Sequence, residues 1–149
     1  MLKVLSDPYI REGRAIGQVL EFCGDGVVAM NMDERATLTN MAVEAGATTG
    51  IIAADHVTVE YLQNQNRWDE RLRPMVELRP DPDATYVHEF SLDLSELRPM
   101  VATPGDPRNG IFLDQLEVIR GGKPVRIDIA YGGSCTGGKM TDMDISCLL

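Results

Sequence analysis

The sequence predicts an α/β fold with a mainly parallel sheet. Stretches typical of strands alternate along the chain with stretches typical of helices, which is the pattern of βαβ units. With 149 residues and 44% hydrophobic composition, the chain has the length of one domain and enough apolar side chains to bury a core. No internal repeat or low-complexity tract is visible. We therefore expect residues 1–149 to form a single domain.

The first strand and the first long helix are predicted in the N-terminal third. Residues 15–22 are expected to form a strand. Asn31, followed three places later by Glu34, resembles a capping box that opens a helix extending to about Ala45. Gly46 is expected to end this helix, because glycine accepts the left-handed conformation common at helix C-termini.

A second strand and helix are predicted directly afterwards. Residues 49–54 form a short apolar run and are expected to be a strand. Asp55 is expected to cap a helix that continues through about Asn64. Residues 66–84 are polar and rich in arginine and proline, so we expect an exposed connection there.

The second half of the chain carries shorter signals. Residues 86–94 alternate between apolar and polar side chains, as a strand does. Residues 99–110 contain three prolines and two glycines and are expected to be a loop. Residues 111–118 are expected to form a short helix. A pair of glycines is then expected to form a turn, and residues 125–130 after it are expected to be a buried strand.

Composition narrows the class of protein. A formal charge of −9 disfavours nonspecific binding to nucleic acid, which requires a basic surface. No run of 18 apolar residues and no signal peptide is present, so we expect a cytoplasmic protein that does not span a membrane. Three cysteines at scattered positions do not form a disulfide framework.

Cys135 lies in a glycine-rich turn between the last expected strand and a helix expected from Met140 onward. Residues 131–139 of this turn read Tyr-Gly-Gly-Ser-Cys-Thr-Gly-Gly-Lys. A strand-to-helix turn surrounds its contents with backbone N–H groups and the positive end of a helix macrodipole, which suits a thiolate, a carboxylate or a phosphate. Cys135 is therefore a candidate metal ligand or nucleophile, and the turn itself is a candidate phosphate-binding loop.

Metal ligation is the leading of these three interpretations. The stretch from Gly133 to Lys139 fits the G-x-x-x-x-G-K of a phosphate loop, but Met140 stands where that loop has Ser or Thr to hold Mg²⁺. A nucleophilic cysteine needs a histidine base, and neither His56 nor His88 lies in a recognisable partner motif. The flanking glycine pairs argue against a buried structural thiol.

Asn40 and Glu44 form a second candidate site on the first predicted helix. They are four residues apart, so they share one face of an α-helix. From this spacing alone, a solvated polar face is the more common explanation.

Several ordered motifs resemble those of the aconitase and isopropylmalate isomerase superfamily, a family of iron–sulfur hydro-lyases. The family carries E-F-x-G-x-G, M-D-E-R-x-T, N-M-x-x-E-x-G-A, an aspartate followed by T-x-x-Y-L and, much later, G-S-C-T-N-G-R. This chain carries them in the same order, with Gly137 in place of the last asparagine and Lys139 in place of the last arginine. The matching segments are residues 21–26, 32–37, 40–47, 55–62 and 133–139.

The resemblance implies a three-layer α/β/α domain and a specific chemistry. Members of the family reversibly dehydrate and rehydrate a hydroxy-di- or tricarboxylic acid. Three cysteines hold a 4Fe–4S cluster whose fourth iron acts as a Lewis acid. A serine on a swivelling domain takes the proton, and arginines bind the substrate carboxylates.

The resemblance also assigns residues. Cys135 matches the first cluster cysteine, so it is the expected cofactor- and metal-binding residue. Asn40 and Glu44 match catalytic residues that border the cluster, and the glutamate hydrogen-bonds the hydroxyl at the open iron. Arg35 is expected to be a structural ion-pairing residue. We expect a partly exposed Cys135 whose loop lies near the helix face carrying Asn40 and Glu44.

Other parts of the family site have no match in this sequence, including the second and third cluster cysteines, the serine and the arginine loops. Cys23 falls at a variable position of its motif, and Cys147 continues an apolar stripe with Met140 and Met143, so it is expected to be buried. The expectation is an internal fragment of an aconitase-like catalytic chain that works with further domains or subunits, including a swivelling domain.

On this interpretation the parent enzyme binds a 4Fe–4S cluster and acts on a small carboxylic acid. The isolated fragment is expected to be inactive and to bind no cluster. The alternative is a non-catalytic binding or interaction module that retains the fold.

Overall fold

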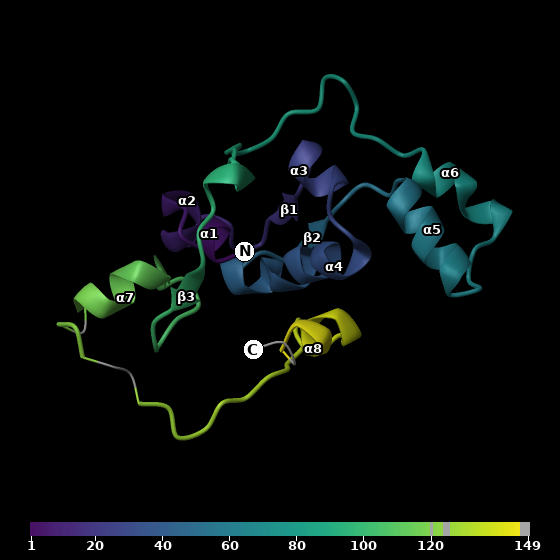
Figure 1. Cartoon of the computed structure of the whole chain (residues 1–149). Coiled ribbons are helices and arrows are strands. Elements are labelled where there is room, and N and C mark those ends of the chain that lie inside the picture. The colour runs from purple at the N-terminus through teal and green to yellow at the C-terminus, as the bar shows by residue number, and fades with distance from the viewer. Residues whose placement is uncertain (120, 124–125, 147–149) are drawn as a thin grey trace.

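The computed structural model describes residues 1–119, 121–123 and 126–146 (Figure 1). The chain begins with two single-turn helices, α1 (Leu2–Leu5) and α2 (Pro8–Arg11). The Asp7 side chain caps α2 by accepting a hydrogen bond from the backbone N–H of Tyr9. These helices supply much of the buried apolar core, whose members are Val4, Leu5, Ile10, Ala15 and Ala45.

A βαβ unit follows and confirms the predicted order of elements. Strand β1 (Val19–Glu21) pairs in parallel with β2 (Thr49–Ile51), so that Leu20 lies opposite Gly50. Between the strands lie α3 (Asp25–Val28), α4 (Met32–Asn40) and the 3₁₀ helix η1 (Met41–Ala45). Both strands are shorter than predicted.

The predicted helix boundaries of this unit are confirmed. Asn31 and Glu34 form a reciprocal capping box, with N···O distances of 2.9 and 3.0 Å. Gly46 ends the helical stretch with a φ of 80°, a left-handed conformation that favours glycine. The last part of the predicted helix is 3₁₀ rather than α.

The second predicted helix is α5 (His56–Asn64), with Asp55 as its N-cap. The polar connection after it is mostly exposed, as predicted, but it contains the short helices η2 (Glu70–Leu72) and α6 (Arg73–Val76). Figure 1 shows α5 and α6 side by side at one end of the molecule.

Two predictions for residues 86–112 are wrong. Residues 86–93 form no strand, and their side chains are mostly exposed; η3 (Leu94–Glu96) follows them. Residues 99–110 are not all loop, because β3 (Met100–Ala102) and β4 (Gly110–Phe112) pair antiparallel. Pro104, Gly105 and Pro107 lie between these strands, whereas Pro99 precedes β3 and Gly110 begins β4. Helix α7 (Leu113–Ile119) follows.

The predicted strand before the Cys135 turn is also not formed in the described residues. Residues 126–130 lie outside any helix or strand, and the Ile127 and Ile129 side chains are 70% and 87% exposed. A buried strand needs a partner strand, and none lies beside this segment among the described residues. The last predicted helix is present as α8 (Met140–Ser146). The predicted burial of Cys147 lies outside the described residues.

The described elements comprise helices and a small parallel sheet, an arrangement compatible with an α/β domain. A separate antiparallel pair accompanies the parallel one, so the expectation of a mainly parallel sheet holds only for the βαβ unit. No three-layer arrangement is evident in the described part. Among the described helices, none is both long and apolar enough to cross a membrane.

Candidate functional site

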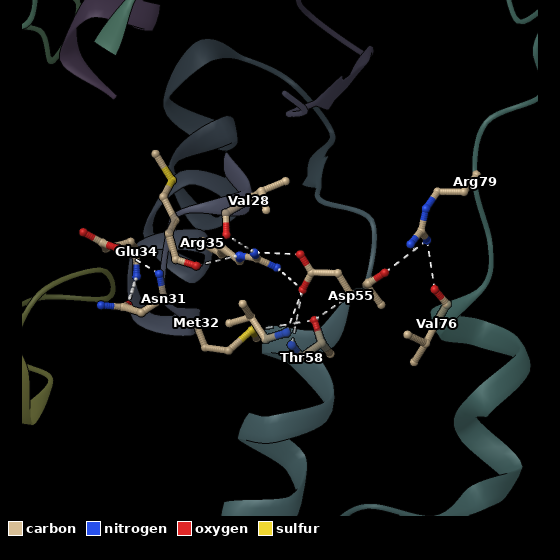
Figure 2. A network of polar contacts seen from close by, with 12 residues as sticks. Val28, Asn31, Met32, Glu34, Arg35, Asp55, Thr58, Val76 and Arg79 are labelled. Carbon is tan, nitrogen blue, oxygen red and sulfur yellow. Dashed lines mark hydrogen bonds and ion pairs between the residues drawn. The ribbon is translucent and has the colours of Figure 1, made fainter. Parts of the chain in front are cut away.

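Arg35 is a buried charged residue of α4, the helix that also carries Asn40 of the candidate site. Its side chain projects from α4 toward the start of α5 (Figure 2) and is 4% exposed. The guanidinium donates to both carboxylate oxygens of Asp55, at 2.7 and 2.9 Å. It also donates to the backbone carbonyls of Met30 and Val28. This charge-assisted, bidentate geometry confirms the expected structural ion pair.

Asp55 connects two elements, α4 and α5, through one carboxylate. Besides pairing with Arg35, it accepts hydrogen bonds from the backbone N–H groups of Val57 and Thr58 at the start of α5 (Figure 2). The hydrogen bonds from Arg35 hold the pKa of Asp55 below its usual value. The pair therefore fixes the orientation of α4 relative to α5.

The loop carrying Cys135 lies against α4. The Lys139 ammonium donates to the Thr37 hydroxyl at 2.9 Å, and the Thr141 hydroxyl donates to the Asp33 carboxylate at 3.0 Å. Asp33 and Thr37 are four residues apart and share one face of α4. The Cys135 side chain is exposed, as expected. The structure thus brings two of the sequence motifs together across about a hundred residues of chain.

Asn40 and Glu44 lie farther along the same helical stretch, and both are exposed. Asn40 is the last residue of α4, whereas Glu44 lies in η1, so a change of helix type separates them. Within the described residues, neither side chain hydrogen-bonds to the Cys135 loop. Their convergence on Cys135 therefore stays a prediction.

Glu44 lines an open pocket of about 300 Å³ between η1 and the turn that joins β3 to β4. On the opposite side, Arg108 makes a bidentate pair with Asp106, with N···O distances of 2.9 and 2.6 Å. These hydrogen bonds lower the pKa of Asp106 to about 2. Sequence reasoning missed this pair, because its only signal was a Pro-Gly-Asp-Pro turn.

The described residues do not by themselves fit a complete iron–sulfur cluster. Such a cluster needs several thiolate ligands converging on one point. Cys23 and Cys135 are both exposed and unlinked, and no group of three His, Cys, Asp or Glu side chains in the described part could hold a metal ion. We derive no reaction step through a cluster.

Comparisons with known proteins agree with the motifs. The model of the aconitase family (aconitate hydratase) matches residues 2–148. The 3-isopropylmalate dehydratase large subunit 2 of Rubrobacter xylanophilus is 42% identical over 143 residues, which is 96% of this chain and 31% of that protein. The 2,3-dimethylmalate dehydratase large subunit of Eubacterium barkeri is 37% identical over 129 residues, 87% of this chain and 28% of the relative.

A third relative, the 3-isopropylmalate dehydratase large subunit of Clostridioides difficile, is 37% identical over 131 residues, 88% of this chain and 29% of its own length. The chain thus spans about three tenths of the length of these relatives. Because the family match covers almost every residue, this chain belongs to the aconitase family.

Proposed function

We propose that this chain is part of an iron–sulfur hydro-lyase that dehydrates and rehydrates a hydroxy-di- or tricarboxylic acid. The family match over residues 2–148 is the observation that carries the proposal. The names of the relatives, dehydratases of 3-isopropylmalate and 2,3-dimethylmalate, support a branched hydroxy acid as the substrate class.

Within this proposal, Cys135 is one thiolate ligand of the 4Fe–4S cluster. Its exposure on a loop held against α4 supports this role. The other thiolates come from segments outside this chain's described residues. When bound, the cluster supplies a Lewis-acidic iron to the departing hydroxyl.

Asn40 and Glu44 are the proposed catalytic residues of the same site. Both are exposed, and within the described part of the chain neither is held by an ion pair, so both are available to a substrate or to a neighbouring domain. Glu44 lies beside an open pocket, and a carboxylate there can exchange a proton with the departing hydroxyl.

The rest of the enzyme completes the site. Residues 1–149 act as an internal domain, and further domains or subunits, including a swivelling domain, supply the base and the carboxylate-binding groups. The naming of the relatives as large subunits supports a partner subunit.

A chimera tests this function. The matching segment of the Rubrobacter large subunit is replaced by this chain, 42% identical to it, and the product is expressed with its small subunit. We expect an active enzyme with a bound cluster. Cys135→Ser should lose the cluster, whereas Glu44→Gln should keep it and lower kcat by about 10²–10⁴-fold.

Cys23→Ser is the matched control and should retain both cluster and activity, because Cys23 is exposed and has no proposed ligand role. A correctly folded chimera whose Cys135→Ser variant keeps a full cluster would show that the assignment is wrong.

The alternative is a non-catalytic module that retains the fold. The exposed Ile127 and Ile129 side chains favour it, because such a surface suits a protein partner. A chimera that folds and assembles but neither binds a cluster nor turns over substrate would support this alternative.

A further inference from the structure

The side chain of Lys139 is held unusually firmly for a loop lysine. It is only 23% exposed, although lysine is rarely buried without partners. Its ammonium donates to the Thr37 hydroxyl and to the backbone carbonyl of Thr136. It also lies 3.8 Å from the Asp142 carboxylate. The lysine therefore connects α4, the Cys135 loop and the start of α8.

Thr37 is oriented to accept this bond. Its hydroxyl donates to the backbone carbonyl of Asp33 one turn earlier, at 3.0 Å, and also lies 3.4 Å from the Thr136 carbonyl of the Cys135 loop. The oxygen lone pairs then remain for the Lys139 ammonium. A second contact, from Thr141 to Asp33, lies one turn away on the same face of α4 and keeps α8 beside it (Figure 1).

The backbone of the loop needs such support. Ser134 has a φ of 128°, outside the region that non-glycine residues favour, and its neighbour Gly133 has a φ of 138°. The carbonyl that Lys139 binds belongs to Thr136, the residue directly after Cys135. The lysine thus holds the loop within one residue of the thiol.

We infer that Lys139 is a positioning residue: its bonds to Thr37 and to the Thr136 carbonyl form a clasp that fixes the loop carrying Cys135 on α4. The importance of this clasp for catalysis rests on the proposed function of Cys135. The clasp itself is a property of this chain alone, so it can be tested without iron or substrate.

The test places a nitroxide spin label on Cys135 in the 149-residue chain, with Cys23→Ser and Cys147→Ser leaving a single thiol. Electron paramagnetic resonance then gives the populations of immobilised and mobile label. A hydrogen bond to a charged group contributes enough that its loss should raise the mobile population by about tenfold. We expect this rise in Lys139→Met and in Thr37→Val.

Conservative variants separate positioning from a general loss of stability. Lys139→Arg keeps a cationic donor and Thr37→Ser keeps the hydroxyl, so both should retain the immobilised spectrum. The double variant Lys139→Met/Thr37→Val should be no more mobile than Lys139→Met alone, because Lys139→Met already removes both bonds of the clasp and Thr37→Val removes only one of them. Lys123→Met, at an exposed lysine of the same region, is the matched control and should change nothing.

Three results would overturn the inference: an unchanged spectrum in Lys139→Met, equal mobility in Lys139→Met and Lys139→Arg, or effects of Lys139→Met and Thr37→Val that add independently. Because the labelled chain contains no cluster, its outcome is separate from that of the chimera. An immobilised label together with an inactive chimera would support the clasp and contradict the proposed function. A mobile label together with an active chimera would contradict the clasp and support the proposed function.

Discussion

At the scale of single residues, the ion pair between Arg35 and Asp55 joins α4 to the start of α5. The guanidinium is buried and makes every one of its bonds to Asp55 or to backbone carbonyls. Asp55→Asn keeps a good N-cap for α5 but removes the negative charge. We expect a loss of about 3 kcal/mol in the free energy of unfolding, measured by urea denaturation, because a buried charge loses its partner.

The same variant reports the pH dependence of the pair. Because the folded-state pKa of Asp55 lies below its unfolded value, the pair stabilises the protein above the unfolded pKa and is lost as pH falls through the folded pKa. Asp55→Asn should therefore lack this part of the acid sensitivity. Asp69→Asn removes an exposed pair with Arg71 and should change stability little; an equal loss in both variants would contradict the prediction.

The residues of the site were predictable from the sequence only as members of motifs. Cys135 and α4 could be named because ordered motifs carried them. The clasp could not, because the bond between Lys139 and Thr37 joins positions about a hundred residues apart. No local pattern reports such a contact.

At the scale of elements, β2 depends on close packing against the end of α4. A Cβ added at Gly50 would lie 2.9 Å from the Cα of Thr39 and 3.0 Å from the Cβ of Ala42. These atoms cannot move without shifting the backbone, so Gly50→Ala should cost about 1–3 kcal/mol of unfolding free energy. Chemical denaturation of the wild-type chain and the variant measures this change in the free energy of unfolding. Gly132→Ala, where a Cβ meets nothing within 4 Å, should be neutral, and similar losses at both positions would refute the packing argument.

The elements differ in how well local sequence determines them. The boundaries of α4 and α5 followed from Asn31 and Asp55, because a capping side chain acts within three residues of itself. The strand expected at residues 86–94 did not form, since alternation specifies a strand only where a partner strand pairs with it. The β3–β4 pair was missed because its strands lie in a segment whose three prolines and two glycines indicate a loop.

At the scale of the whole molecule, the described residues provide one candidate cluster ligand in place of the several that a cluster needs. We expect anaerobic reconstitution of the isolated chain, followed by iron and sulfide analysis, to give far less than four irons per chain. Hydratase activity on isopropylmaleate or aconitate should stay at the level of a blank, because the serine base and the arginine loops that the resemblance implies have no match in this sequence. Near-stoichiometric four-iron incorporation would contradict this expectation.

The segment just before the Cys135 loop exposes several large apolar side chains to solvent. Ile127, Ile129 and Tyr131 are 70%, 87% and 83% exposed, and they alternate along a stretch that pairs with no strand in the described part of the chain. Stretches with this pattern are templates for intermolecular β-pairing and aggregation. Arg126 and Asp128, interleaved with the apolar side chains, act as charged gatekeepers against it. Solubility should therefore fall first in variants that neutralise these two charges.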